Sequence, residues 1–305
     1  MKKNILLGLL LFVIFKTHAQ IDMNDSTAQV VGYWDNNEKQ TYTVSHEKYK
    51  VKDNDTTSRE FFRYVVDITV IDSTEDSYTI KWVYRDMEFN SDNEFLKKLS
   101  SVAENTPVTI KTDELGVFLE VVNWEEIRDS IYKILDKLQV EFNGLPNIDQ
   151  MLGQIKNMYS TKESIESGTI NEIQQFYLFH GGKYKLGEKI NSSILLANLY
   201  GGDPFDTDVE IWLDELNPDD NNFILRMQQS VNSEQLTKTT FDYLTKVSET
   251  MKVPGPKWDD FSPLQNNTWT ASRIHTSGWI IYSVETKEVS SEGTINVDET
   301  IIEIQ

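Results

Sequence analysis

The stretch 209–231 alternates between apolar and polar residues on both sides of a polar turn. Val209, Ile211 and Leu213 share one face of an extended chain, and Phe223 and Met227 resume the same period. An alternation with period two is typical of a strand that buries one face. Residues 216–222 between the two runs include a proline and are rich in asparagine and aspartate, the residue types that favour turns. The sequence therefore predicts a β-hairpin with a long polar loop.

A second hairpin of the same design occurs earlier in the chain, and its context is similar. Residues 64–70 and 78–84 alternate around the polar turn 72–77. A strand-like stretch precedes each hairpin, and a helix signal and then another hairpin around a glycine follow it. In the first half, the stretch, the helix and the second hairpin are 40–51, 91–103 and 108–122. In the second half they are 189–198, 232–251 and 268–284. We therefore predict two copies of a β-ββ-α-ββ unit, and an α+β fold of curved antiparallel sheets.

The residues between the two copies have the period of helices. Trp124, Ile127, Ile131 and Leu135 recur at helical spacing, and two glycines at 181 and 182 end the block. The predicted organisation is a signal peptide at 1–19, a flexible N-terminal arm at 20–37, a first β-rich repeat at 38–122, a helical segment at 123–182 and a second β-rich repeat at 183–305.

The first residues of the chain carry an export signal. Lys2 and Lys3 precede an apolar run at 5–15 that is too short to span a bilayer, and Ala19 provides a small residue at the predicted cleavage site. The chain contains no cysteine, which excludes disulfides, thiolate metal sites and lipid attachment at an N-terminal cysteine. We therefore expect a periplasmic or secreted protein that is not a lipoprotein, with no membrane insertion of the mature chain.

The mature chain is strongly acidic. The first 19 residues carry three lysines and no acid, so 26 basic residues remain against 49 acidic ones, a formal charge of −23. Such a charge repels phosphate backbones and anionic lipid surfaces. Nucleic acid is therefore not an expected partner.

Few residues form a recognisable site. Asp203, Asp206 and Asp208 place acidic side chains at near-alternate loop positions, which is the type of ligand that Ca²⁺ binds, although the rest of a calcium loop is missing. Calcium is the one cofactor that the sequence suggests. Trp212 and Trp279 are out of step with their apolar neighbours and are candidates for an exposed surface that grips a ligand or partner. The other interpretation is that both faces of the sheet are covered.

No catalytic residue can be named. His46, His180 and His275 are far apart and lack the spacing of a zinc motif, and the acids are too numerous for one pair to stand out. A glycosidase would need two carboxyl groups about 5–10 Å apart across a cleft.

Two segments carry a resemblance. The signal ending Thr17-His18-Ala19-Gln20 resembles the signals of exported Bacteroidota proteins. The run 198–205, Asn-Leu-Tyr-Gly-Gly-Asp-Pro-Phe, leading into a hairpin, resembles uncharacterised exported families of that group. These families have no assigned activity, so the resemblance implies export and transfers no functional residue.

Three functions remain open at this point. The first is a non-enzymatic exported protein that binds an apolar molecule such as a lipid, or a partner such as an envelope protein, between sheet and helices. The second is a glycan hydrolase that works through carboxylates, and the third is a structural or adhesive envelope protein. An apolar cavity would favour the first, two facing acids with perturbed pKa values the second, and a solid core with exposed tryptophans the third.

Overall fold

The computed structural model describes residues 20–53, 55–90, 106–144, 148–168, 170–198 and 202–305. The predicted signal peptide and the predicted helix at 91–103 lie outside the described residues. Within the described part of the chain, no helix is both long enough and apolar enough to cross a membrane.

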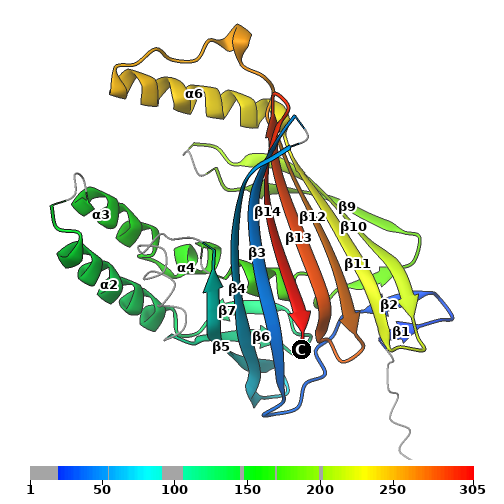
Figure 1. Ribbon diagram of the computed structural model, residues 1–305. Coiled ribbons are helices and arrows are strands. Elements are labelled where there is room, and N and C mark those ends of the chain that lie inside the picture. Colours follow the sequence, from blue (N-terminus) through cyan, green and yellow to red (C-terminus); the bar gives the residue numbers. More distant parts are fainter. Residues whose placement is uncertain (1–19, 54, 91–105, 145–147, 169, 199–201) are drawn as a thin grey trace, which may run out of the picture.

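One continuous sheet of eleven strands forms the frame of the molecule (Figure 1). Every neighbouring pair of strands is antiparallel, and the order across the sheet is β7-β6-β5-β4-β3-β14-β13-β12-β11-β10-β9. The strands are β3 (Lys39–Lys52), β4 (Asp55–Ser73), β5 (Ser77–Phe89), β6 (Val108–Asp113), β7 (Phe118–Val121), β9 (Lys189–Leu196), β10 (Phe205–Asn217), β11 (Asn222–Val231), β12 (Gln265–His275), β13 (Ile280–Ser291) and β14 (Thr294–Ile304). The α+β fold with antiparallel strands is therefore confirmed, and both β-rich regions belong to one sheet.

The alternation in the sequence sets the register of the sheet. In β4, Tyr64, Val66 and Ile68 are buried, while the residues between them are more exposed. Val66 lies opposite Tyr84 and Ile68 lies opposite Trp82. Side chains opposite each other on antiparallel strands share a face, so these residues form one apolar layer.

The strands follow one another along the chain in the same order in the two halves of the sheet. In the first half β3, β4 and β5 are followed by β6 and β7; in the second, β9, β10 and β11 are followed by a helix and then by β12 and β13. Both sets run in the same direction across the sheet, and β14 lies between them. The helix of the first copy would fall at 91–105, outside the described residues, and the duplicated unit stays a prediction.

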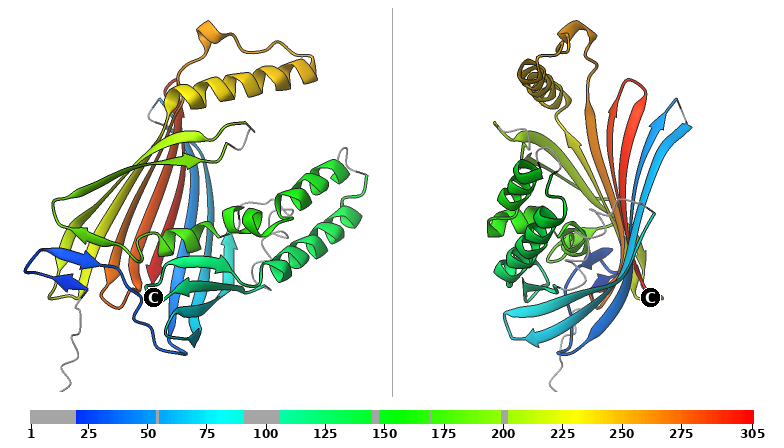
Figure 2. Two further views of the ribbon diagram at one scale, coloured as in Figure 1. Left: turned by 180° about the vertical axis from the view of Figure 1, so that it is seen from behind. Right: turned by 60° about the vertical axis from the view of Figure 1, so that its left-hand side comes forward.

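Four helices lie on the concave side of the sheet (Figure 2). They are α2 (Trp124–Glu141), α3 (Ile148–Met158), α4 (Lys162–Gly168) and α5 (Asn171–Tyr177), and they occupy the predicted helical segment. α2 buries Ile127, Ile131, Leu135 and Leu138, the stripe expected from its period. The core lies between these helices and the sheet, and it continues to Leu213 of β10 and Leu225 of β11 in the second half.

The segment 20–37, expected as a flexible arm, contributes to the core. It contains β1 (Ile21–Asp22) and β2 (Thr27–Gln29), which form a small sheet with β8 (Lys183–Lys185). Trp34 is buried, with its ring centroid 5.1 Å from those of Tyr78 and Trp279. Gly278 adopts a positive φ, and a Cβ there would lie 2.5 Å from the carbonyl oxygen of Val31, so this turn requires glycine.

The helix α6 (Ser233–Met251) lies across one end of the sheet (Figure 1). Asn232 caps it by accepting a hydrogen bond from the backbone N–H of Gln235, as the sequence predicts. Leu236 packs against Phe205 and Val231 and so joins the helix to β10 and β11. The chain then returns through a short 3₁₀ helix, η1 (Trp258–Asp260), where Trp258 packs edge-on to Phe241 of α6.

Candidate functional site

The face of the main sheet that α5 covers is here called the inner face. It is polar in some regions and apolar in others. Gln175 of α5 donates a hydrogen bond to Ser283 Oγ (2.9 Å) and another to the carbonyl oxygen of Thr300 (3.3 Å). These contacts fix which side of β13 and β14 faces the helices. Ser272 lies opposite Ser283 on β12, at 2.8 Å between the hydroxyl oxygens.

The contacts from Gln175 continue into a polar belt that crosses the inner face. His46 contacts Thr300 Oγ1 through Nδ1 (2.9 Å) and the hydroxyl of Tyr64 through Nε2 (3.3 Å). Tyr84 donates from its hydroxyl to Glu172 Oε1 of α5 (2.8 Å). The polar belt is defined as His46, Tyr64, Tyr84, Glu172, Gln175, Thr270, Ser272, Ser283, Glu285 and Thr300.

Burial shifts the pKa values of the ionisable groups of the belt toward the neutral forms. It lowers the pKa of His46 to about 4, so this imidazole is uncharged at neutral pH. Burial also raises the pKa of the Glu172 carboxyl, although hydrogen bonds, including those from Tyr84 and Tyr64, oppose the change.

A second acid of the belt lies farther along the sheet. Glu285 of β13 accepts a hydrogen bond from Thr270 Oγ1 (3.2 Å), and burial raises its pKa. Glu172 is bonded to Tyr84 of β5, and four strand spacings separate β5 from β13. At about 4.8 Å per spacing, the backbones of β5 and β13 are about 19 Å apart. Glu172 itself lies on α5, one turn from Gln175, which contacts β13.

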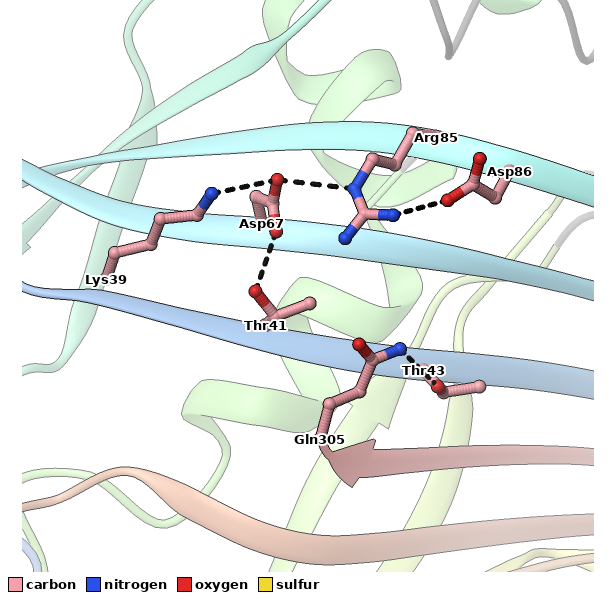
Figure 3. A network of polar contacts seen from close by, with 7 residues as sticks. All are labelled: Lys39, Thr41, Thr43, Asp67, Arg85, Asp86 and Gln305. Atoms are coloured by element: carbon pink, nitrogen blue, oxygen red, sulfur yellow. Dashed lines mark hydrogen bonds and ion pairs between the residues drawn. The ribbon is translucent and has the colours of Figure 1, made fainter.

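The outer face is charged and exposed, as Figure 3 shows for one network. Asp67 accepts a hydrogen bond from Thr41 Oγ1 (2.7 Å) and lies 3.0 Å from Lys39 Nζ and 3.3 Å from Arg85 Nε. Burial alone would raise the pKa of Asp67, but these hydrogen bonds bring it below its usual range. The outer face is therefore solvated and stabilised by ion pairs, and the inner face holds the candidate site.

Apolar side chains remain uncovered at the β9 edge of the inner face. Ile190, Ile194 and Leu196, here called the β9 row, are 47%, 41% and 38% exposed. They lie opposite Ile211, Thr207 and Phe205 of β10, so they share the inner face with the core residues of that strand.

The helix α6 extends this apolar surface beyond the sheet. Leu244, Val247 and Met251 follow Leu236 at helical spacing and form the α6 stripe. Leu236 packs against Phe205, which lies opposite Leu196, so the stripe continues from one end of the β9 row. Leu244 is 37% exposed and Met251 is 67% exposed.

A cleft of about 270 Å³ lies at the other end of the β9 row. Ile190 belongs to both the row and the cleft, which also borders the small sheet. The lining residues are Thr27, Lys183, Tyr184, Lys185, Glu188 and Ile190.

The predicted calcium ligands do not converge. Among the described residues, no three His, Cys, Asp or Glu side chains form a group that could hold a metal ion. The Asp206 carboxylate instead accepts a hydrogen bond from Gln235 Nε2 (2.7 Å), and Asp208 accepts one from Ser193 Oγ (3.1 Å). The Asp203 carbonyl oxygen accepts a hydrogen bond from Asn198 Nδ2 (3.1 Å).

The two tryptophans do not form an exposed surface. Trp279 is buried, and its indole N–H donates to Glu38 Oε1 (2.6 Å), so the prediction of an exposed ring is wrong for this residue. It lies in the turn before β13, where the alternation of the strand does not apply. Trp212 is half-buried on the outer face, with the ammonium of Lys189 5.1 Å from its ring centroid.

The sequence interpretation did not identify the residues of the inner-face site. His46 belongs to the polar belt, whereas His180 is buried elsewhere and donates from Nε2 to the carbonyl oxygen of Gly278 (2.9 Å). The period of residues 189–198 predicts a strand, and a strand is present. The period does not show, however, that the apolar side chains of this strand stay exposed in the fold.

Comparisons with known proteins place the chain in no family. No family model matches it, and no curated protein matches it. A chain from a structure of lipid–protein interactions in lipovitellin is similar at a TM-score of 0.38 and 9% identity, over 89% of this chain. The present chain spans 25% of that chain's length. The complex of MucA and MucB from Pseudomonas aeruginosa gives a TM-score of 0.13 and 6% identity, over 87% of this chain and 89% of that one.

Proposed function

We propose that this protein is an exported, non-enzymatic binding protein whose inner face holds an apolar chain between the sheet and the helices. The observation that carries the proposal is the exposed aliphatic side chains of the β9 row, which the buried contact between Phe205 and Leu236 joins to the α6 stripe. An exposed apolar surface with polar surroundings is typical of a site that binds a ligand or partner. The duplicated repeat is part of this proposal, since two equal halves would build the one wide concave sheet.

The position of the acids favours binding over glycan hydrolysis. Glu172 and Glu285 both have raised pKa values, as catalytic acids often do. A glycosidase needs two acids that face each other at about 5–10 Å across a cleft. Here each acid accepts a hydrogen bond from a separate residue, Tyr84 for Glu172 of α5 and Thr270 for Glu285, and neither lines the cleft beside the small sheet.

The positions of Trp212 and Trp279 give no support to an adhesive role. Trp279 lies in the core, and Trp212 lies half-buried on the charged outer face. Exposed aromatic rings such as Tyr243 and Trp258 do occur, but the four exposed apolar residues of β9, Ile190, Ile194, Leu195 and Leu196, are all aliphatic. Such residues suit an alkyl chain better than a sugar, which stacks on aromatic rings.

Adjacent residues of β9 allow a matched test. Ile194 faces the inner side and Leu195 faces the outer side, and both are exposed, at 41% and 68%. We expect Ile194→Gln to weaken the binding of a neutral apolar dye such as Nile red about fivefold, because part of a buried aliphatic contact is lost. Fluorescence titration gives the dissociation constants.

The control variant is Leu195→Gln, which makes the same chemical change on the other face. It should bind the dye as tightly as the native protein. Equal losses in both variants, or no dye binding to the native protein, would contradict the proposed function.

A further inference from the structure

The cleft at one end of the β9 row is charged, whereas the row itself is apolar. Lys183 and Lys185 line the cleft together with one acid, Glu188. Asp25 pairs with Lys183 beside the cleft, so the four charged groups there sum to zero in a chain of strongly negative charge. An anion therefore meets two ammonium groups and less repulsion here than over the molecule as a whole.

Each of the two lysines forms an ion pair in which a bound anion can replace the acid. Lys183 Nζ lies 3.5 Å from Asp25 Oδ2, and Lys185 Nζ lies 2.7 Å from Glu188 Oε1. All four side chains are about half exposed or more. Exposed ion pairs contribute about 1 kcal/mol or less, so a bound anion can compete for the ammonium groups. The hydrogen bond that Lys185 donates to Glu188 raises the pKa of Lys185, which is therefore cationic at neutral pH.

The dimensions of the row set the length of a ligand. Six residues separate Ile190, in the cleft, from Leu196, next to α6. At about 3.4 Å per residue, the row is about 20 Å long. Beyond it, Phe205 and Leu236 connect the row to the α6 stripe.

We propose that the ligand is a long-chain carboxylate, with its head in the cleft between Lys183 and Lys185 and its alkyl chain along the β9 row toward α6. This inference rests on the proposed function, since it requires that the row binds an apolar chain. It adds the head group, the direction and the length of the ligand. The hydroxyl of Thr27, which donates to Asp25 Oδ1 (2.5 Å), lies in the same lining and can turn to the head.

Chain-matched probes test the head group. Tetradecanoate, tetradecan-1-ol and tetradecyltrimethylammonium are titrated below their aggregation concentrations, by displacement of Nile red from the mature protein. We expect the carboxylate to bind about tenfold more tightly than the alcohol, because charge-assisted hydrogen bonds favour it, and the ammonium to bind most weakly. Octanoate should bind more weakly than tetradecanoate, since a shorter chain covers only part of the row.

Two double variants with the same change of charge identify the lysines. In Lys183→Gln/Lys185→Gln, the carboxylate should bind no more tightly than the alcohol, while the affinity for the alcohol stays unchanged. The control is Lys189→Gln/Lys238→Gln; Lys189 lies over Trp212 on the outer face, and Lys238 pairs with Asp242 on α6. This control should keep the preference for the carboxylate.

The possible failures are distinct. If the alcohol or the ammonium binds as tightly as the carboxylate, or if the preference survives in Lys183→Gln/Lys185→Gln, the head-group assignment is overturned while the proposed function stands. If none of the three probes binds and Nile red does not bind either, both are overturned.

Discussion

Two buried tyrosines of the inner face differ in whether their hydroxyl has a partner. The Tyr84 hydroxyl donates to Glu172, whereas the buried hydroxyl of Tyr42, on β3, has no hydrogen-bond partner among the residues that the structure describes. A buried polar group without a partner costs about 1–3 kcal/mol, whereas a hydrogen bond to a carboxyl group contributes about 1.5–3 kcal/mol. Removing the two hydroxyls should therefore have opposite effects.

We predict that Tyr42→Phe raises the free energy of unfolding by about 1 kcal/mol and that Tyr84→Phe lowers it by about 2 kcal/mol. Urea unfolding followed by tryptophan fluorescence measures both. The variants serve as controls for each other, since each loses one hydroxyl from a buried ring. A loss of stability in Tyr42→Phe as large as in Tyr84→Phe would show that its hydroxyl has a partner in solution.

The histidine of the polar belt makes stability depend on pH. The pKa of His46 is about 4 in the folded chain and about 6.5 in the unfolded chain. Between these values the unfolded chain binds a proton that the folded chain excludes, so the free energy of unfolding falls as the pH falls. Lys48 and Asp298 lie near the ring and oppose each other in their effect, and burial dominates.

We predict that His46→Gln loses less stability than the native protein when the pH falls from 7 to 4, by about 3 kcal/mol. His180, whose pKa burial also lowers to about 4, titrates in the same window and remains in the variant. Urea titrations at a series of pH values give the two profiles. Parallel profiles for the variant and the native chain would contradict the neutral, buried state of His46.

At the scale of elements, α6 depends on a small apolar cluster of its own. Leu236, Phe205, Val231 and Leu264 form this cluster, separate from the main core. We predict that Leu236→Ala lowers the stability of α6 by about 2 kcal/mol and leaves the main core intact. Hydrogen exchange should show faster exchange of the α6 amides and unchanged exchange in β4 and β5. An equal effect on both regions would mean that α6 and the sheet unfold together.

The elements were largely predictable because period and turn chemistry are local properties. The strands at 64–84 and 209–231 and the helix beginning at Trp124 follow directly from apolar spacing. The role of Asn123 did not follow: its position suggests a helix cap, but its side chain accepts a hydrogen bond from the Thr109 N–H of β6 (2.8 Å). Such a contact depends on which strand lies beside the helix, and apolar spacing within the chain carries no information about that.

The site was less predictable than the elements. A strand pattern shows that Ile190, Ile194 and Leu196 share a face, but it does not show whether another element covers that face. Trp279 illustrates the converse, because an apparently misplaced ring is buried by Trp34 and bonded to Glu38 from distant parts of the chain. Coverage is a tertiary property, and it decides which residues are available to a ligand.

For the whole molecule, the central claim is that the concave sheet carries an apolar molecule of lipid size. Native mass spectrometry of the mature protein, purified from its own host without detergent, tests this claim most directly. We predict a bound mass that persists in the folded protein, disappears on denaturation, and is strongly reduced in Ile194→Gln but not in Leu195→Gln. A bare protein mass, together with no uptake of tetradecanoate when it is added, would contradict the account.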